Sequence, residues 1–317
     1  MIKKIALFSV EASLEIGTGH AMRCMVLADL LANIGWECSF ISSQKSYDLI
    51  SKLGRFTRIE PEEFWNNPIQ HELLIFDNYS LDEFYENHFR KYAEKILVID
   101  DLANRKHNCD FLLDQNLGTK VEDYKNLVNS NCKILSGTHY CLLRPEFAQL
   151  RQTALEKRSQ TKIIKKILVN FGGSDINNHS ENALREIEKS DFCGEVEVVL
   201  GFNALHLEKI QNFAKNSKNK ITIHAQADMA QLIFEADMAI AAGGTSAWER
   251  CCLGLPTYIV KIADNQEKIF KELGSADNFN KFYLKLLDNY QAQVKKIANY
   301  VDGKGASRVI SSIIQQK

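Results

Sequence analysis

A repeated alternation of short apolar runs with longer helical patterns constrains this chain most strongly. The runs are rich in β-branched residues, almost unbroken, and mostly end in a polar residue. This is the pattern of parallel strands covered by helices on both faces. In the first half we predict strands at residues 5–8, 38–42, 73–77, 96–100, 111–114 and 133–135. In the second half we predict strands at residues 167–171, 196–200, 221–224, 238–241 and 257–260.

The same alternation fills both halves of the 317 residues, enough chain for two domains of ordinary size. We therefore predict an α/β fold with two Rossmann-like, doubly wound domains that face each other across a cleft. Residues 151–164 are polar and charged and carry no strand pattern, so we predict a linker there. It would separate a first domain at residues 1–150 from a second at residues 165–317.

The first helix is predicted between the first two strands. Apolar residues recur there at helical spacing, and Gly35 closes the pattern as a typical residue after a helix end. The apolar positions are Ala21, Cys24, Ala28, Leu31 and Ile34. Only a short apolar stretch precedes Glu11, so we interpret the N-terminus as a strand and not as a secretory signal.

Charge and composition exclude several classes of function. The 39 basic and 40 acidic residues leave a net charge of -1, without the basic excess that is usual in nucleic-acid binders. No apolar run approaches the roughly 18–20 residues of a membrane span, so we expect no membrane insertion. The eight cysteines form no C-x-x-C pair, and Cys251 and Cys252 are adjacent, which suits neither a zinc site nor a disulfide framework. We expect reduced thiols and a cytoplasmic protein. The sequence indicates no particular protein partner.

Three glycine-rich turns follow predicted strands, where ligands bind in open α/β sheets. The first contains Gly17, Gly19 and His20, with Arg23 one turn further on. Glycines let the backbone approach a ligand, and a helix start disfavours a protonated histidine. His20 is therefore a candidate general base. The alternative is an ordinary surface or core histidine.

The second and third turns lie in the second half. Backbone N–H groups at Gly173, with the hydroxyl of Ser174, could cradle a phosphate, or the turn could simply carry an Asp helix cap. The third turn offers Gly244, Thr245 and Ser246 in the same way.

Glu249 lies one turn beyond the third turn and could accept hydrogen bonds from the two hydroxyls of a ribose. Alternatively, it is a solvated helix charge paired with Arg250 or another neighbour. Asn265 and Gln266, after the last predicted strand, could contact a sugar or a pyrophosphate.

Two phosphate-type turns and a ribose-type acid in one domain favour a nucleotide diphosphate over NAD(P). The first turn reads Gly-Thr-Gly-His-Ala-Met and lacks the G-x-G-x-x-G dinucleotide fingerprint. The chain also lacks the D-x-D motif that holds metal in one class of nucleotide-sugar enzymes. Asp100 and Asp101 could bind a metal, although neighbouring acids at a strand end more often cap and bridge loops. We expect no cofactor and no metal.

Stretches along nearly the whole chain match one known family. In the first half they are residues 16–20, 22–24, 100–105, 107, 109–110, 113–116 and 142–147. In the second half they are residues 171–175, 244–245, 248–251, 253–256, 263–266 and 301–306. In this order and spacing the chain resembles the UDP-2,4-diacetamido-2,4,6-trideoxy-β-L-altropyranose hydrolases of pseudaminic acid biosynthesis (PseG). These are relatives of the MurG-like glycosyltransferases with the GT-B fold.

The resemblance implies that His20 is the general base acting on water and that the second domain holds UDP. We expect direct displacement at the anomeric carbon, which releases UDP and the free sugar for a flagellin or surface-glycan pathway. Tyr79 and Asn104 are candidate sugar contacts, and we also assign Arg144, in a matched stretch, to substrate binding. The alternatives are a GT-B glycosyltransferase that uses a UDP-amino sugar, and a non-catalytic nucleotide-sugar sensor.

Two segments depart from the family pattern. Residues 8–13 read Phe-Ser-Val-Glu-Ala-Ser where family members more often have Arg-Ala-Asp-Ala-Ser, and residues 274–279 look shortened. Both departures concern the detail of the substrate and not the class of reaction. Because the chain ends at Lys317, we expect it to lack the acetyltransferase domain that is fused to some relatives.

Overall fold

A computed structural model describes residues 3–13, 18–50, 54–173, 175–201, 204–225, 227–262, 266–274 and 276–315. The chain divides into two compact units, and each is described by itself. Unit 1 comprises Met1–Leu143 and Lys304–Lys317, and unit 2 comprises Arg144–Gly303. Among the described residues, no helix combines the length and the apolar character needed to cross a membrane.

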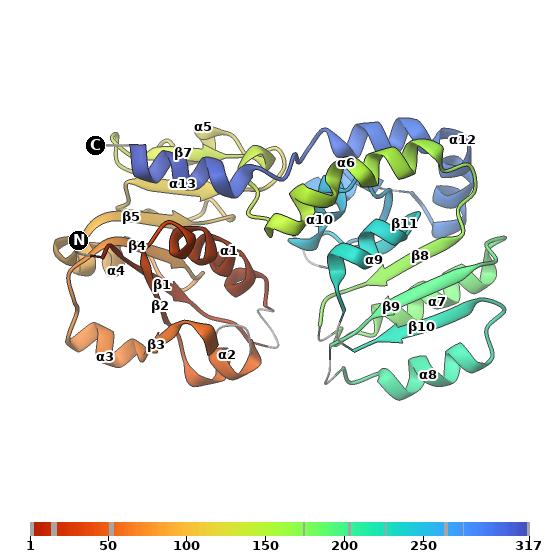
Figure 1. Ribbon diagram of the computed structural model, residues 1–317, viewed down its shortest axis with the longest axis horizontal. Helices are drawn as coiled ribbons and strands as arrows, with labels where there is room; N and C mark the ends of the chain where they lie inside the picture. The colour runs from red at the N-terminus through yellow and green to blue at the C-terminus, as the bar shows by residue number, and fades with distance from the viewer. Residues whose placement is uncertain are drawn as a thin grey trace. The chain divides into compact units, whose positions relative to one another are not determined.

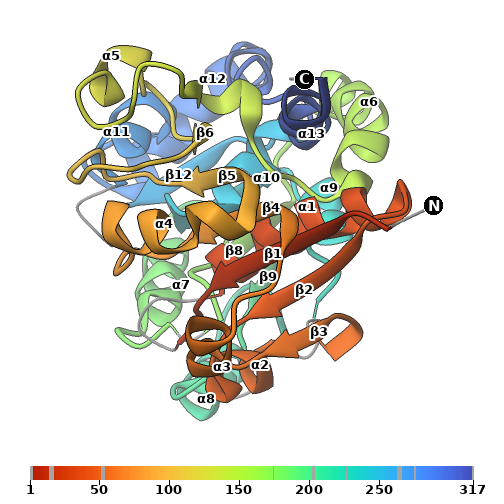
Figure 2. The same ribbon diagram turned by 90° about the vertical axis from the view of Figure 1, so that its left-hand side faces the viewer.

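Unit 1 is built on a seven-stranded parallel sheet with the strand order β3-β2-β1-β4-β5-β6-β7 (Figures 1 and 2). Its strands are β1 (Ile5–Val10), β2 (Glu37–Ile41), β3 (Thr57–Ile59), β4 (His71–Asp77), β5 (Ala93–Ile99), β6 (Phe111–Asp114) and β7 (Lys133–Ser136). Its helices are α1 (Gly19–Asn33), α2 (Gln44–Leu49), α3 (Pro61–Asn66), α4 (Glu83–Phe89), η2 (Arg90–Tyr92), α5 (Val121–Tyr124), η3 (Thr138–Tyr140) and α13 (Gly305–Gln315).

Unit 2 has a five-stranded parallel sheet with the order β10-β9-β8-β11-β12. Its strands are β8 (Lys166–Asn170), β9 (Glu195–Val199), β10 (Lys220–His224), β11 (Met238–Ala242) and β12 (Thr257–Val260). Its helices are α6 (Pro145–Gln160), α7 (His179–Lys189), α8 (Leu207–Lys215), α9 (Met229–Glu235), α10 (Ser246–Cys252), α11 (Glu267–Ile269), the π-helix η5 (Phe270–Gly274) and α12 (Phe279–Ala298). Every predicted strand is therefore present, and the sheets are parallel as the apolar runs indicated.

The end of the chain returns to unit 1, which differs from the predicted boundary. Helix α13, dark blue in Figure 1, packs against α1, and its Val309 and Ile313 are buried in the same core as Leu27. Gly305 allows this close approach, because a Cβ there would lie 2.3 Å from the carbonyl oxygen of Cys141. The return is tertiary packing between distant segments, so no local pattern predicts it.

Helix α6 occupies most of the predicted linker. Pro145 starts the helix at a position where its missing N–H costs nothing. The charged residues that suggested a linker instead donate to backbone carbonyl groups at other helix ends. Arg158 is fully buried and donates to Ile233 and Ala236 over 2.6 and 3.0 Å, at the end of α9. Arg151 donates to Ala298 at the end of α12 over 2.7 Å.

Candidate active site

A first candidate site, in unit 1, lies where the strand order of the sheet reverses. Strands β1 and β4 are neighbours in the sheet, but their onward connections run to opposite sides. Ligand sites of open α/β sheets lie at this point, beyond the carboxyl ends of the strands. Asp77 is the last residue of β4, and α1, which follows β1, starts at Gly19 with His20 in its first turn.

His20 and Asp77 form a buried hydrogen-bonded pair. Nδ1 of His20 lies 2.6 Å from Oδ1 of Asp77, and the two residues are 8% and 0% exposed. A carboxylate can only accept, so the proton lies on Nδ1 and the neutral ring carries its free lone pair on Nε2. The pair therefore sets the tautomer in which Nε2 can accept a proton.

Asp77 is further held by Arg23 and Cys24. Nε and Nη2 of Arg23 donate to the two carboxylate oxygens over 2.7 and 2.6 Å, and the Cys24 thiol donates over 3.5 Å. Burial alone would raise the pKa of Asp77, but the charge of Arg23, followed by that of His20, outweighs it and holds the pKa well below its usual range. Asp77 is thus a fixed, ionised partner for the imidazole.

Asp101 and Tyr79 complete a ring of side chains around His20. Nη1 of Arg23 lies 3.3 Å from Oδ2 of Asp101, so the guanidinium bridges two carboxylates. The Tyr79 ring meets the His20 ring edge to face, with their centres 4.7 Å apart. Partial burial raises the pKa of Tyr79, and the charge of Asp101 raises it further, so Tyr79 stays neutral. Arg23 is only 4% exposed, so its side chain is closed off from solvent.

Asp100, next to Asp101, organises the loop between β5 and β6. It pairs with Arg105 over 2.7 Å and accepts from the Ala103 N–H over 2.9 Å and the Tyr124 hydroxyl over 3.0 Å. Asp100 therefore has the loop-capping role that was the alternative to metal binding. The described residues contain no group of three or more His, Cys, Asp or Glu side chains placed to hold a metal ion.

A second candidate site lies within unit 2, at the corresponding reversal between β8 and β11. The turn after β8 contains Gly172, whose φ of +88° is a conformation that glycine adopts readily. Gly201, which follows β9, donates to the carbonyl of Gly173 over 2.9 Å. A Cβ on Gly201 would lie 2.2 Å from that carbonyl oxygen. Only glycine at position 201 therefore leaves the predicted phosphate turn in place. Asp175 also caps α7, with N–H groups of His179 and Ser180 donating to it.

The turn after β11 leads into α10. Space is open beside Gly244, where an added Cβ would have no neighbour within 4 Å. The Ser246 hydroxyl accepts from Nη1 of Arg250 over 3.0 Å, which leaves its own proton for another acceptor. Nη2 of Arg250 donates to the Ala242 carbonyl over 2.7 Å. Gln266 supports the same turn, because its side-chain oxygen accepts from the Gly243 N–H over 3.3 Å.

Glu249 lies one turn into α10, in contact with the start of α6. Its Oε1 is 3.7 Å from Nη2 of Arg144, whose Nη1 pairs with Glu146 over 2.8 Å. Burial raises the pKa of Glu249 to about 7, and the positive charges of Arg144 and then Arg250 only partly offset this effect. Glu249 therefore pairs with a neighbour, as in the predicted alternative, but this neighbour is Arg144, because the Arg250 guanidinium donates to Ser246 and Ala242.

No family model matches this chain. It is 28% identical to the UDP-2,4-diacetamido-2,4,6-trideoxy-beta-L-altropyranose hydrolase of Campylobacter jejuni, over 82% of this chain and 93% of that protein. It is 28% identical to the spore coat polysaccharide biosynthesis protein SpsG of Bacillus subtilis, over 84% and 80%. An uncharacterised protein of Methanocaldococcus jannaschii is 26% identical over 98% of this chain, which spans only 66% of that protein's length.

Solved structures show the fold. Acinetobacter baumannii MurG matches with a TM-score of 0.70 and 12% identity, over 99% of this chain and 100% of that one. The fold is of the GT-B type. UDP-GlcNAc 2-epimerase from Neisseria meningitidis, bound to UDP-GlcNAc, matches with a TM-score of 0.61 and 12% identity, over 99% and 100%. The GT-B fold confirms the prediction of two doubly wound α/β domains.

Within this GT-B chain, the predicted residues form two groups. In unit 1 the structure brings together His20, Arg23 and Tyr79. Asn104 is exposed and accepts from Arg105 over 3.4 Å, outside this ring. In unit 2 it brings together Arg144 and Glu249. Three predicted residues lie outside the described residues, namely Gly17, Ser174 and Asn265.

Sequence reasoning missed Asp77 and Gly201 as site residues, and it considered Asp101 only as a possible metal ligand. Asp77 and Asp101 follow apolar strands at the sheet edge where His20 was expected, so their position was the available signal. Nothing in the sequence shows that Gly201 contacts Gly173.

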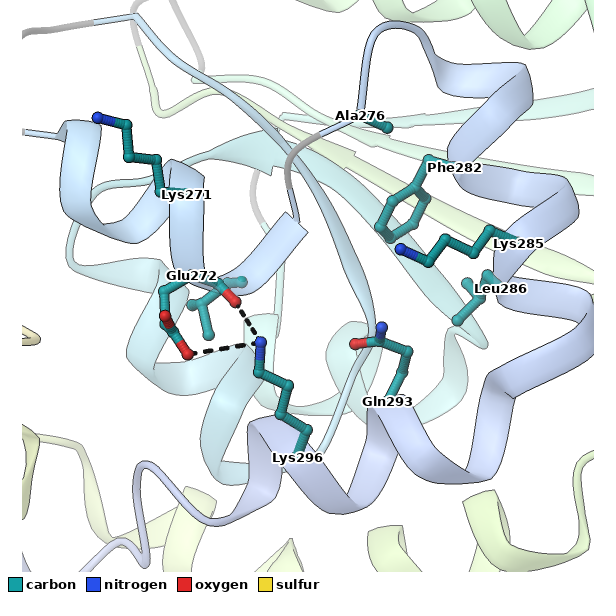
Figure 3. A pocket seen from close by; sticks show the side chains of 9 residues that line it. Lys271, Glu272, Ala276, Phe282, Lys285, Leu286, Gln293 and Lys296 are labelled. Carbon is teal, nitrogen blue, oxygen red and sulfur yellow. Dashed lines mark hydrogen bonds and ion pairs between the residues drawn. The ribbon is translucent and has the colours of Figure 1, made fainter.

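A small pocket in unit 2 contains none of the predicted site residues. Its volume is about 130 Å³, and its lining is Lys271, Glu272, Leu273, Ala276, Phe282, Lys285, Leu286, Gln293 and Lys296 (Figure 3). Lys296 already donates to the Glu272 carbonyl over 2.7 Å and pairs with its carboxylate over 3.4 Å. The pocket therefore has no residue in common with the glycine-rich turns that follow β8 and β11.

Proposed function

We propose that this protein hydrolyses UDP-2,4-diacetamido-2,4,6-trideoxy-β-L-altropyranose to UDP and the free 2,4-diacetamido-2,4,6-trideoxy-L-altrose, in pseudaminic acid biosynthesis. The coarser part of this proposal is a nucleotide-sugar-processing enzyme of sugar biosynthesis. The Campylobacter and Bacillus relatives, together with the GT-B neighbours, support it. The finer part, water as the acceptor, is supported by the surroundings of His20.

The observation that carries the proposal is the group formed by His20, Asp77, Arg23 and Asp101, of which the first three are buried. With both carboxylates ionised, this group has a net charge of about -1 while His20 is neutral, and about zero once the imidazole is protonated. These side chains thus stabilise the imidazolium that forms when Nε2 takes a proton. Asp77 also holds the imidazole of His20 in the required tautomer. A base prepared in this way can activate a molecule as weakly acidic as water.

The reaction we propose is a single displacement. Nε2 of His20 accepts a proton from water, whose oxygen forms a bond to the anomeric carbon. The bond from that carbon to the diphosphate oxygen breaks, and its electron pair leaves with UDP. Because one displacement inverts a carbon centre, the free sugar has the opposite anomeric configuration. UDP is a good leaving group, so no strong general acid is required.

We assign nucleotide binding to unit 2. The turns at residues 172–174 and 244–246 supply N–H and hydroxyl donors for the diphosphate, and Arg250 polarises the Ser246 hydroxyl. Glu249 accepts from the ribose hydroxyls. Tyr79 remains our candidate sugar contact, whereas the engagement of Arg23 with two carboxylates supports a positioning role for it in place of substrate contact.

The assay that tests the proposal supplies purified protein with the UDP-2,4-diacetamido sugar and water alone. We expect equal amounts of UDP and free sugar, and we expect His20→Asn to bind UDP normally but to turn over about 10²–10⁴-fold more slowly. Turnover that requires an added acceptor would support the alternative, a GT-B glycosyltransferase. Binding of the UDP-sugar without turnover would support a nucleotide-sugar sensor.

A further inference from the structure

Glu249 occupies an unusual setting for a ligand-binding carboxylate. Its side chain is 18% exposed, at the junction of α10 and α6. The charged and titratable groups that face it are Arg250 and Cys252 on α10, and Arg144 and Glu146 on α6. A carboxylate that is so little exposed loses most of its hydration, so its neighbours decide whether it is charged.

Arg144 is the cation placed to keep the Glu249 carboxylate ionised. Arg250 directs its guanidinium to Ser246 and Ala242, which leaves Arg144, at 3.7 Å, as the arginine paired with Glu249. The Arg144 guanidinium lies 5.1 Å from the centre of the Phe147 ring, and its buried Nε has no hydrogen-bond partner among the described residues. Its position at the cap of α6 and its pair with Glu146 restrain it beside Glu249.

We propose that Arg144 is a positioning residue for nucleotide recognition, which keeps Glu249 ionised and oriented toward the two hydroxyls of the ribose. The inference rests on the proposed function, because the ribose of UDP is the ligand that Glu249 accepts there. It assigns to Arg144 an action through Glu249, in place of the direct substrate contact predicted from the sequence.

The consequence is nucleotide binding that depends on pH in a defined direction. The pKa of Glu249 is about 7, because burial raises it and the positive charges of Arg144 and then Arg250 lower it in part. Only the ionised carboxylate accepts from both ribose hydroxyls, so affinity is complete well above that pKa and falls as the pH drops through it. Loss of Arg144 raises the pKa further, so the fall in affinity begins at a higher pH.

The test measures UDP affinity by calorimetry from pH 6 to pH 9 for the wild-type chain and for Arg144→Gln, Arg144→Lys and Glu249→Gln. The phosphate of UDP titrates as well, so each curve is divided by that of Glu249→Gln, which retains only the phosphate effect. We expect Arg144→Gln to move the midpoint upward by about one pH unit and Arg144→Lys to restore much of it. Arg185→Gln is the matched control, since Arg185 pairs with Glu181 on the exposed side of α7, and it should leave the curve unchanged.

A second measurement does not depend on ligand binding. The carboxyl carbon of Glu249, assigned by its loss in Glu249→Gln, can be titrated by NMR in the ligand-free protein. The inference requires a higher midpoint in Arg144→Gln, or in Arg144→Met should the first variant fail to fold.

The outcomes separate the inference from the proposed function. If Glu249→Gln weakens UDP binding but the midpoints of the Arg144 variants match the wild type, the inference is overturned and the proposed nucleotide site stands. If Glu249→Gln binds UDP as tightly as the wild type at every pH, the ribose assignment and the inference both fall.

Discussion

Replacement of Asp77 by Asn tests whether the charged side chains around His20 prepare it to act as a general base. The variant keeps the shape of the side chain but removes its charge. An Asn oxygen can still accept from Nδ1 of His20, but an Asn amide group facing that nitrogen would force the proton onto Nε2. In either orientation the imidazolium loses its counter-ion at 2.6 Å. We expect turnover to fall by about 10²–10⁴-fold, the usual contribution of a positioned general base.

The same change removes the main partner of buried Arg23. Breaking a buried ion pair from one side costs about 3–5 kcal/mol of unfolding free energy, and the pair with Asp101 should offset part of this cost. Turnover is therefore measured well below the unfolding temperature of the variant, with circular dichroism to confirm that it is folded. UDP affinity should stay at the wild-type value, because Asp77 belongs to unit 1.

A double-mutant cycle decides whether Asp77 acts through His20. If it does, the pair His20→Asn and Asp77→Asn together should turn over no more slowly than His20→Asn alone. Near-normal turnover of folded Asp77→Asn, or losses that multiply in the double variant, would refute the argument.

Three further predictions concern the nucleotide side and metal dependence. Glu249→Ala should weaken UDP binding by about 1.5–3 kcal/mol, the range for hydrogen bonds to a charged group, and unchanged affinity by calorimetry would make Glu249 a structural charge. Gly201→Ala should displace the Gly173 carbonyl, lower the free energy of unfolding by roughly 1–3 kcal/mol and weaken UDP binding. The control Gly54→Ala, which has open space around the added Cβ, should change neither stability nor UDP binding. Equal behaviour of the two variants in thermal melts and calorimetry would contradict this prediction. Treatment with EDTA should leave turnover intact, and a loss that Mg²⁺ or Mn²⁺ reverses would instead make Asp100 and Asp101 metal ligands.

Much of the fold could be predicted because parallel strands buried on both faces need unbroken apolar runs. The strand β3 (Thr57–Ile59) was missed because it is a short edge strand without such a run. The prediction that Ile34 belongs to the apolar face of the first helix was wrong, because Ile34 follows the helix and is 54% exposed. Gly35, with a φ of +90°, does lie just beyond the helix end. Helix α6 was mistaken for a linker because its polar residues include Arg151 and the buried Arg158, whose guanidinium groups donate to distant carbonyl groups.

The candidate site could be predicted only in part. Strand-end position identified His20 and the glycine turns, since the fold itself brings those loops to the sheet edge. The partner of His20 lies 57 residues away in sequence and could not be paired from local pattern. Likewise, the arginine beside Glu249 was matched by resemblance, but its contact depends on the packing of α6 against α10.

The most direct test of the account is to follow the oxygen atom of water during hydrolysis of the UDP-2,4-diacetamido sugar. A His20 base that activates water for attack on the anomeric carbon predicts cleavage of the carbon–oxygen bond. In ¹⁸O-labelled water the label should appear in the free sugar and not in UDP. Rapid NMR, before mutarotation, should show the anomeric configuration opposite to that of the substrate. Label in UDP, or in a sugar phosphate, would mean attack at phosphorus and would contradict the mechanism.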